Sequence, residues 1–253
     1  MAQVPAAHQT LSILRFLARQ AGPVAAATIA RELGLPRSTA YHLLATLQDE
    51  GFVVHLPEER RFGLGVSAYE LGTGYTRHAP LQRLAQVQLA ALVDRTRHGA
   101  HFAVLHGRDV LYVIEERAPG RPPLVTDAGV RLPAQLTASG RAMLAALPPQ
   151  QVRALFPGPE AFVTRNDRGP RSPSALRQVL AEVRRLGFAV EDGEISPGFG
   201  SVGAAVLDHN GHPLASVAVT YPDVEVSPQR RTQLAMRVVD TARTLSKRIS
   251  GAR

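Results

Sequence analysis

Residues 34–53 read GLPRSTAYHLLATLQDEGFV and predict a helix with one apolar face and one unusual polar face. We expect this helix from about Pro36 to Glu50, because a proline at the first helical position loses no intrahelical hydrogen bond and Gly51 favours a stop. Four apolar residues recur at the spacing of one helical face and should pack inward: Ala40, Leu43, Leu44 and Leu47. The opposite face carries small, polar and ring-bearing side chains instead of ordinary charged ones, which suits close approach to another surface.

The segments on either side of this helix predict a compact unit that ends in a hairpin. The apolar residues that mark a first amphipathic helix are Leu11, Ile13, Leu14, Phe16 and Leu17. Those that mark a second helix, which closes at Gly34, are Ile29, Ala30 and Leu33. Residues 52–56 and 61–64 read as two strands joined by a turn at residues 57–60. This order is typical of a winged helix-turn-helix domain, which we place at residues 1–66.

Composition restricts the class of protein. The chain has 253 residues, enough for one large or two modest domains, and a formal net charge of +8, which favours a polyanionic partner. It contains no cysteine, which excludes disulfides, thiolate nucleophiles and cysteine-ligated metals and fits a reducing compartment. The first ten residues lack a signal-peptide core, and no later stretch reaches the ~20 apolar residues of a membrane span. We therefore expect a cytoplasmic protein with no membrane association.

Beyond residue 66 the pattern changes to alternating helices and strands. Residues 67–80 should form a helical connector that is broken near its glycines and Pro80. We place the linker at residues 67–78, the domain boundary near His78 and the second domain at residues 79–253. A helical stripe follows the linker and consists of Leu81, Ala85, Leu89 and Leu92.

The second domain is predicted to mix hairpins and helices. Residues 100–116 should form a hairpin around Gly107-Arg108, and residues 201–208 and 213–220 should be antiparallel strands that flank Asn210-Gly211. One helix should start at Ser172-Pro173 and end at Gly187, and a terminal helix should begin at Ser227-Pro228.

Four stretches resemble the IclR family of bacterial transcriptional regulators. Residues 34–53 and 55–72 are similar to the winged-helix domain of that family. Residues 136–148 (LTASGRAMLAALP) and 184–208 (RRLGFAVEDGEISPGFGSVGAAVLD) are similar to two segments of its effector-binding domain. The resemblance implies an α+β chain in which the winged helix joins, through a helical linker, an α/β domain with a curved antiparallel sheet. It also implies dimers or dimers of dimers.

The polar face of the quoted helix suits the major groove of double-stranded DNA. That groove admits a helix and presents donors, acceptors and methyl groups to short side chains. We expect DNA contacts from Arg37, Ser38, Thr39, Tyr41 and His42, and from Arg60 and Arg61 on the wing. The family often has an arginine where this chain has His42.

One winged helix contacts too few base pairs for tight selection, so a homodimer or homotetramer should read a near-palindromic operator. We predict a ligand-responsive repressor. An activator is the alternative, because the operator's position relative to a promoter decides the direction of regulation.

The resemblance also implies an effector pocket. In the family, the segment that contains Ser139 and Gly140 borders this pocket, as do the positions of Glu191, Phe199, Ser201, Ala218 and Thr220. Ser139 and Gly140 should lie at the amino end of a helix, where free amides and the helix dipole favour an anion. We expect a small organic acid whose carboxylate binds at Ala138-Ser139, with Ser201 and Thr220 as donors and Leu132 and Phe199 as apolar walls. Glu191 should accept from a hydroxyl or amine of the ligand, or be protonated when the site fills.

Several other patterns point to sites that we set aside, and no metal or cofactor is expected. Residues 198–203 match the GxGxxG spacing, but they lead into an apolar run, so a bend beside a pocket is preferred over a dinucleotide site. His98 with His101 and His209 with His212 lack further ligands for a metal and are interpreted as surface loop residues.

Two other functions remain as alternatives. Ser139, Glu191, Glu194 and the histidines could form a hydrolase site, but the chain has no GxSxG motif. We therefore expect no enzyme. An architectural DNA-binding protein would explain the charge and would show little site preference, but it would leave the second domain without a role.

Overall fold

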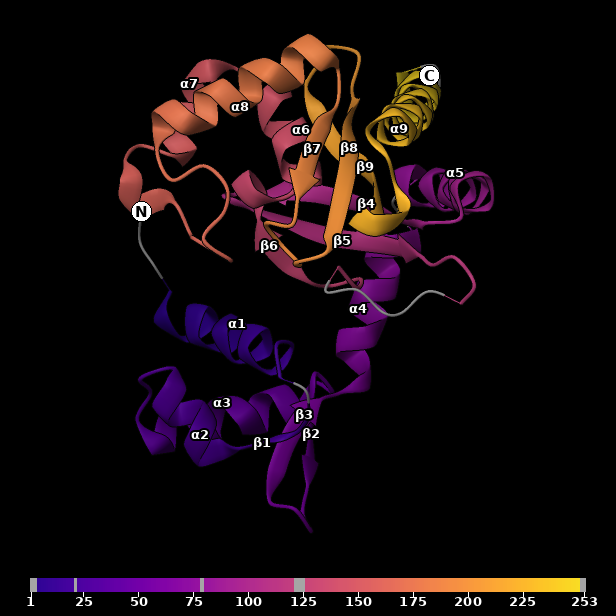
Figure 1. The fold of residues 1–253 in the computed structure, drawn as a ribbon. Helices are drawn as coiled ribbons and strands as arrows, with labels where there is room; N and C mark the ends of the chain where they lie inside the picture. The colour runs from indigo at the N-terminus through magenta and orange to yellow at the C-terminus, as the bar shows by residue number, and fades with distance from the viewer. Residues whose placement is uncertain (1–3, 21, 78–79, 121–125, 251–253) are drawn as a thin grey trace. The chain divides into compact units, whose positions relative to one another are not determined.

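The structure is a computed structural model that describes residues 4–20, 22–77, 80–120 and 126–250. The chain divides into two compact units, Met1–Ala79 and Pro80–Arg253 (Figure 1). The boundary expected near His78 lies outside the described residues.

The first unit is a winged helix-turn-helix domain, as predicted. Its helices are α1 (Pro5–Leu17), α2 (Ala26–Glu32) and α3 (Arg37–Asp49), and its strands are β1 (Val24–Ala25), β2 (Val53–Leu56) and β3 (Arg61–Leu64). The strands form a small antiparallel sheet in the order β1-β3-β2. Ile13, Ile29 and Leu44, one from each helix, are fully buried together and form the centre of its core.

Two local expectations for this unit are wrong. Pro36 is the N-cap of α3 and not its first helical residue: its ψ of 141° is extended, although its carbonyl accepts the first helical hydrogen bond, from the amide of Ala40, at 3.0 Å. Leu11 lies outside the apolar stripe of α1, with 55% of its surface exposed.

The connector is helical, but it is not broken at its glycines. Helix α4 (Val66–Arg77) runs through Gly72 and Gly74 without interruption. The break expected at the glycines was wrong, because glycine lowers helix propensity by only about 1 kcal/mol and keeps its backbone hydrogen bond, unlike proline. The break expected near Pro80 is confirmed, since α4 ends at Arg77 and α5 (Pro80–Thr96) begins at Pro80.

The second unit is built on one antiparallel sheet. Its strands are β4 (Gly99–His106), β5 (Asp109–Glu116), β6 (Arg131–Pro133), β7 (Ala189–Asp192), β8 (Phe199–Leu207) and β9 (Pro213–Pro222). The sheet has six strands in the order β6-β5-β4-β9-β8-β7, and it is curled. Its helices are α5 (Pro80–Thr96), α6 (Ala138–Ala146), α7 (Pro149–Leu155), α8 (Pro173–Leu186) and α9 (Pro228–Ser250). Short 3-10 turns lie at Ala134–Leu136, Pro159–Ala161 and Asp223–Glu225.

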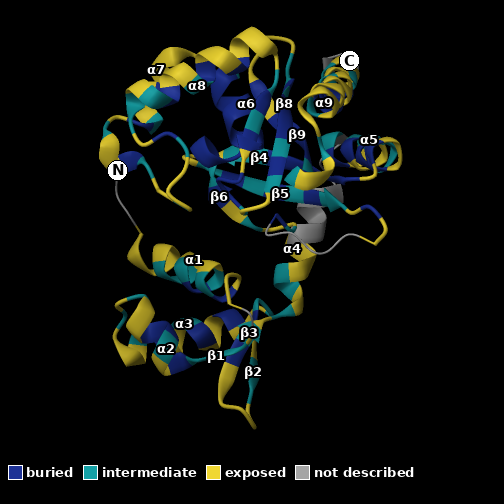
Figure 2. Cartoon of the chain, viewed as in Figure 1, coloured by how far each residue is buried: buried dark blue, intermediate teal, exposed yellow. Residues whose placement is uncertain are grey.

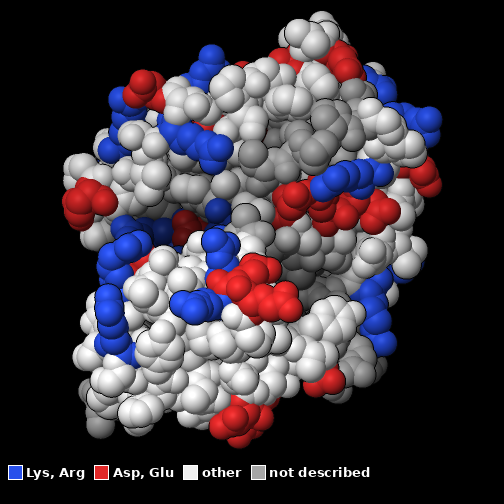
Figure 3. Space-filling view, turned by 90° about the horizontal axis from the view of Figure 1, so that it is seen from below, with Lys and Arg blue, Asp and Glu red and all other residues white. Residues whose placement is uncertain are grey.

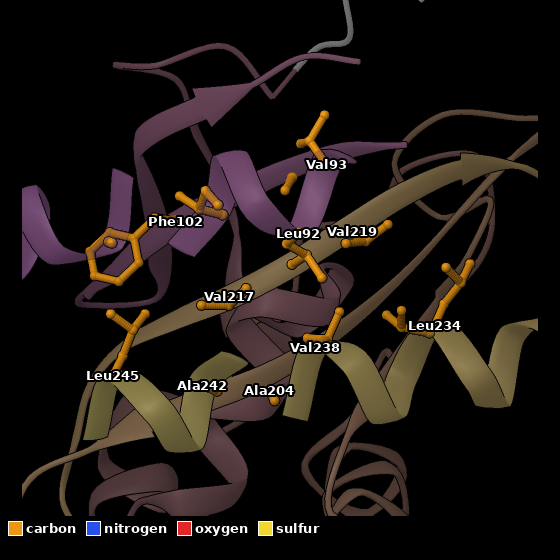
Figure 4. Close-up of a cluster of buried hydrophobic side chains, with 14 of the residues drawn as sticks. Leu92, Val93, Phe102, Ala204, Val217, Val219, Leu234, Val238, Ala242 and Leu245 are labelled. Carbon is orange, nitrogen blue, oxygen red and sulfur yellow. The ribbon is translucent and has the colours of Figure 1, made fainter. Parts of the chain in front are cut away.

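The helices cover the two faces of the sheet in separate layers. Helices α5 and α9 pack on one face, where Phe102 and Val217 of the sheet meet Leu92, Leu234 and Val238 (Figure 4). Helices α6 and α8 and the segment around Phe156 form the core on the other face. Buried residues are concentrated where the helices meet the sheet (Figure 2). Neighbouring strand residues such as Phe102 and Ala103, or Ala189 and Val190, therefore belong to different cores.

The expected hairpins and helix ends of this unit are confirmed. Strands β4 and β5 pair across Gly107-Arg108, and β8 and β9 pair across Asn210-Gly211. Ser172 caps α8 by accepting from the amide of Ala175 at 3.2 Å, and Gly187 ends it with a φ of 80°. Within the part of the chain that the structure describes, no helix has the length and apolarity that crossing a membrane requires.

Candidate functional site

A small cavity lies between the amino end of α6 and the sheet of the second unit. It is lined by His101, Tyr112, Thr126, Thr137, Ala138, Ser139, Glu191, Ile195, Ser196, Phe199, Ser201, Ala218 and Thr220. Its volume is about 20 Å³. A space of that size holds about one water molecule, so a larger occupant requires its walls to move.

Strand register places three polar side chains in one row across the sheet. Glu191 of β7 pairs with Ser201 of β8, and Ser201 pairs with Thr220 of β9. The Ser201 hydroxyl donates to Glu191 Oε2 at 3.0 Å, and Ser201 Oγ and Thr220 Oγ1 are also 3.0 Å apart. When Glu191 is ionised, Ser201 donates to the carboxylate and the Thr220 hydroxyl can donate to Ser201, so the three side chains form one hydrogen-bond chain.

The Glu191 carboxyl is held in an environment that favours its protonated form. Burial raises the pKa of Glu191 to about 7, against an ordinary value of 4.5, and the charge of Glu194 raises it further. The Ile195 amide, which donates to Glu191 Oε1 at 3.0 Å, and the Ser201 hydroxyl oppose this shift. Glu194 is itself paired with Arg141 at 2.6 Å. Glu191 can therefore gain or lose a proton near neutral pH.

The amino end of α6 supplies backbone donors at the cavity. Thr137 is the N-cap, and its Oγ1 accepts from the Gly140 amide at 2.9 Å. Among the described residues, no hydrogen bond occupies the amides of Ala138 and Ser139. Gly203 of β8 lets the helix approach, because an added Cβ would lie 2.9 Å from the carbonyl carbon of Ala138. Free amides at a helix start attract an anion.

Among the described residues, the buried Nδ1 of His101 has no hydrogen-bond partner, and the Tyr112 hydroxyl is the one side-chain group that interacts with the buried Ser139 hydroxyl. The other nitrogen of His101, Nε2, lies 3.4 Å from Thr126 Oγ1. Burial lowers the pKa of His101 to about 4, so this histidine is neutral at pH 7 and can either donate or accept. An unpartnered buried polar group is costly, and a bound polar molecule would relieve that cost.

Most of the predicted effector residues line this cavity, and two do not. Those that line it are Ala138, Ser139, Glu191, Phe199, Ser201, Ala218 and Thr220. Leu132 packs in the core beneath α6, and Gly140 packs against the backbone of Ala134, where an added Cβ would lie 2.2 Å from its carbonyl oxygen. In the structure, the Gly140 amide donates to Thr137 Oγ1 and the Ser201 hydroxyl donates to Glu191 Oε2.

Sequence reasoning missed several lining residues: His101, Tyr112, Thr126, Thr137, Ile195 and Ser196. The interpretation of His98 and His101 as surface loop residues is wrong, since both are buried, at 6% and 1% exposure. The sequence did contain a signal for His101. It precedes the apolar Phe102 in a predicted strand, and successive side chains of a strand face opposite sides of the sheet. Thr137 could have been predicted as a helix N-cap, because threonine is a favoured residue at that position.

The GxGxxG stretch and the second histidine pair have the local structure that was predicted. Gly198 has a φ of 81°, and β8 begins at the next residue, so the GxGxxG stretch is a bend that enters a strand beside the cavity. His209 and His212 are exposed at the β8–β9 turn. No group of three metal-ligating side chains occurs among the residues that the structure describes.

The candidate DNA-binding residues lie on the surface of the first unit. Arg37, Ser38, Tyr41 and His42 are exposed on α3, and Tyr41 retains 54% of its accessible surface. Thr39 is half-buried beside the inward stripe and presents less of its side chain than expected.

Both wing arginines are exposed at the β2–β3 turn. Arg60 has a φ of 53°, and the Arg61 guanidinium donates to the Pro23 carbonyl at 3.4 Å. Figure 3 shows acidic side chains interspersed with basic ones on the face seen from below.

Both units match models of known protein domains. Residues 6–57 match the model of the IclR helix-turn-helix domain, and residues 73–247 match that of the bacterial transcriptional regulator IclR C-terminal domain. The transcriptional repressor IclR of Escherichia coli is 27% identical over 99% of this chain and 92% of its own. The glycerol operon regulatory protein of Streptomyces coelicolor is 30% identical over 97% of this chain and 96% of its own.

Solved structures agree with this fold. An IclR transcriptional regulator from Alicyclobacillus acidocaldarius has a TM-score of 0.86 at 23% identity and covers 97% of this chain and 98% of its own. An IclR homologue from Microbacterium hydrocarbonoxydans, solved with 4-hydroxybenzoate, has a TM-score of 0.80 at 19% identity and covers 97% of this chain and 99% of its own. The chain belongs to the IclR family of bacterial transcriptional regulators.

Proposed function

We propose that this protein is a ligand-responsive repressor that binds a near-palindromic operator as a homodimer or homotetramer. The single observation that carries the ligand-responsive part is the cavity at the amino end of α6, where the amides of Ala138 and Ser139 have no hydrogen-bond acceptor among the described residues. The E. coli and Streptomyces relatives are named as a repressor and an operon regulator, which supports the transcriptional part. The DNA target of a bacterial regulator lies in the cytoplasm, where we infer that the protein acts.

The DNA contacts come from α3 and the wing. Ser38 and Tyr41 are exposed at the spacing of one helical face and would contact base edges, with Arg37 and His42 beside them. Arg60 and Arg61 would contact phosphate or the minor groove. Thr39 would contribute less, because it is half-buried.

The effector is a small organic acid whose carboxylate accepts from the Ala138 and Ser139 amides and from Ser139 Oγ. Neutral His101 offers Nδ1 to a second polar group of the ligand, and Phe199 and Ala218 supply apolar wall. A carboxylate at this position would favour protonated Glu191, because two negative charges in one buried site repel each other. Binding should therefore take up a proton above pH 7.

A hydrolase is not supported by the geometry. Ser139, His101 and Glu191 all line the cavity, but the described residues contain no hydrogen bond from Ser139 to a histidine, and the Glu191 oxygens accept from Ile195 and Ser201. A nucleophile needs a base within hydrogen-bond reach and a group that orients the base.

The test uses the full chain in two steps. Selection of bound sequences from a random DNA library should yield a near-palindromic operator, and calorimetry with small aliphatic and aromatic carboxylates should then find a ligand that changes operator affinity. Ser139→Ala should weaken that ligand about tenfold, since one hydrogen bond to a charged group is worth ~1.5 kcal/mol.

Ser216→Ala is the matched control for this experiment. Ser216 is also a fully buried serine of the same unit, but it lies in β9 and outside the cavity lining. Equal ligand affinity in wild type and Ser139→Ala would place the effector elsewhere. Selection that returns no preferred sequence would contradict the regulator and favour an architectural protein.

A further inference from the structure

A second hollow in the effector-binding unit lies between α7 and α8 and has an apolar floor. Its volume is about 200 Å³, and its floor consists of Val152, Phe156, Leu176 and Leu180. These residues belong to the same core as α6, so the floor is a rigid part of the fold. A cavity of ~150 Å³ can bind a molecule of the size of benzene, so this groove has room for a small organic molecule without rearrangement, unlike the central cavity.

The rim of the groove is basic and contains no acidic residue. Arg153 projects from α7, and Arg177 and Arg184 lie two helical turns apart on α8. Arg184 is held in place, because its Nε donates to the carbonyl of Ala145 at 2.8 Å. This bond leaves its two terminal nitrogens without a hydrogen bond among the described residues.

The other two rim arginines have no acceptor of their own. In the described part of the chain, neither Arg153 nor Arg177 forms a side-chain hydrogen bond or an ion pair, although both are exposed. The neighbouring Arg185, which lies outside the groove, is paired with Glu182. The groove therefore combines an apolar floor with guanidinium groups that no protein carboxylate neutralises.

We propose that this groove binds an amphiphilic carboxylate, with its hydrocarbon body on the apolar floor and its carboxylate at the arginine rim. A guanidinium presents paired N–H donors that match the two oxygens of a carboxylate, and an apolar chain or ring leaves water when it covers the floor. A cation would meet three like charges at the rim. This site shares no lining residue with the central cavity and does not rest on the function proposed for that cavity.

Octanoate, below its micellar concentration, is the probe for this site. Calorimetry on the full chain should show octanoate binding, and octylammonium, which has the same chain length and the opposite charge, should not bind. The double variant Arg153→Gln, Arg177→Gln should weaken octanoate at this site at least about tenfold, because it removes two charged donors. Both side chains are exposed, so folding should be unaffected.

Two further variants locate the binding. Arg237→Gln makes the same change at an exposed arginine of α9 that does not line the groove, and it should leave octanoate affinity unchanged. Ser139→Ala should also leave the affinity of the groove for octanoate unchanged. If octanoate also occupies the central cavity as a second site, Ser139→Ala should weaken that site and the double arginine variant should weaken the groove.

Two results would overturn the proposal. The first is the absence of octanoate binding, and the second is equal affinity in wild type and in the double arginine variant. If the double variant also changes its oligomeric mass by light scattering in the second case, a second copy of the chain covers the groove.

Discussion

The pKa values of Glu191 and His101 shift in opposite directions although both side chains line the same cavity. Burial raises the pKa of Glu191 to about 7 and lowers that of His101 to about 4. Desolvation disfavours the charged form of each group, and the charged form is deprotonated for one and protonated for the other. Both side chains are therefore neutral in mildly acidic solution, where the cavity has its lowest electrostatic cost.

The raised pKa of Glu191 should make the free energy of unfolding depend on pH. Between pH 4.5 and about 7 the folded protein keeps a proton that the unfolded chain has released, so the stabilising contribution is complete below pH 4.5 and is lost as pH rises to about 7. The difference between these pKa values corresponds to about 3 kcal/mol. Glu191→Gln removes this dependence. In urea unfolding, the variant should therefore gain stability relative to wild type as pH rises from about 5 to about 8.

Glu160→Gln is the control for that measurement, because it makes the same chemical change at an exposed position of the same unit. A wild-type minus Glu191→Gln difference that stays constant across this range would show that the carboxyl is ionised in the folded protein. The subtraction also cancels the opposite contribution of His101.

Base contacts of α3 should be measurable one side chain at a time. Ser38→Ala and Tyr41→Ala should each cost on the order of 1 to 3 kcal/mol at the selected operator, with little change in affinity for unrelated DNA. Gel shifts compare these variants with Gln48→Ala, an exposed change in the last turn of the same helix. If purified, folded Ser38→Ala and Tyr41→Ala bind the operator like wild type, α3 does not enter the groove.

At the scale of elements, the cavity exists because α6 lies close over β8 and β9. Two glycines allow this approach. Gly203 leaves room for the backbone of Ala138, and Gly140 leaves room for the carbonyl of Ala134. The Thr137 cap then fixes the first turn of the helix and leaves the next amides directed to solvent or ligand.

Gly203→Ala should separate α6 from the sheet. The added Cβ would lie 2.9 Å from backbone atoms that cannot rotate away, so we expect a loss of about 1 to 3 kcal/mol in the free energy of unfolding and weaker effector binding. Gly63→Ala, in strand β3, is the control, because its Cβ would lie 3.6 Å from the nearest atom, in ordinary contact. Equal stability of the two variants in thermal unfolding would show that the helix can move aside without cost.

For the whole molecule, the net charge of +8 should matter less than where the arginines lie. DNA binding releases counterions in proportion to the phosphates contacted, whereas distant charges are screened within ~10 Å at moderate salt. The mixed charges in Figure 3 fit this expectation.

Salt dependence of operator binding tests this expectation. Arg60→Gln and Arg61→Gln should each weaken binding to all DNA sequences and reduce the slope of log affinity against log salt by about one. Arg237→Gln changes the net charge equally in the other unit and should leave the slope unchanged. Equal slopes in all three variants and the wild type would exclude the wing arginines as phosphate contacts.

The sequence by itself determined the local features of this protein. Hairpins at Gly107 and Asn210-Gly211, the Ser172 cap and the Gly187 stop were all predictable, because turns and helix ends depend on residues that are neighbours in the chain. The family resemblance added the α+β architecture and most of the cavity positions. The prediction from local periodicity was wrong for Leu11, which is exposed. An apolar stripe identifies the apolar residues of a helix but does not show which of them a neighbouring element covers.

Only the tertiary structure decided which groups meet and in what state. The contact of Ser201 with Glu191 and Thr220 depends on the register of three strands, and the burial of His101 depends on the sheet pairing and on the helix layer above it. A slip of one residue would turn these side chains to the opposite core. Protonation, hydrogen-bond direction and cavity size follow from such long-range pairing, because desolvation and Coulomb interaction act through space and not along the chain.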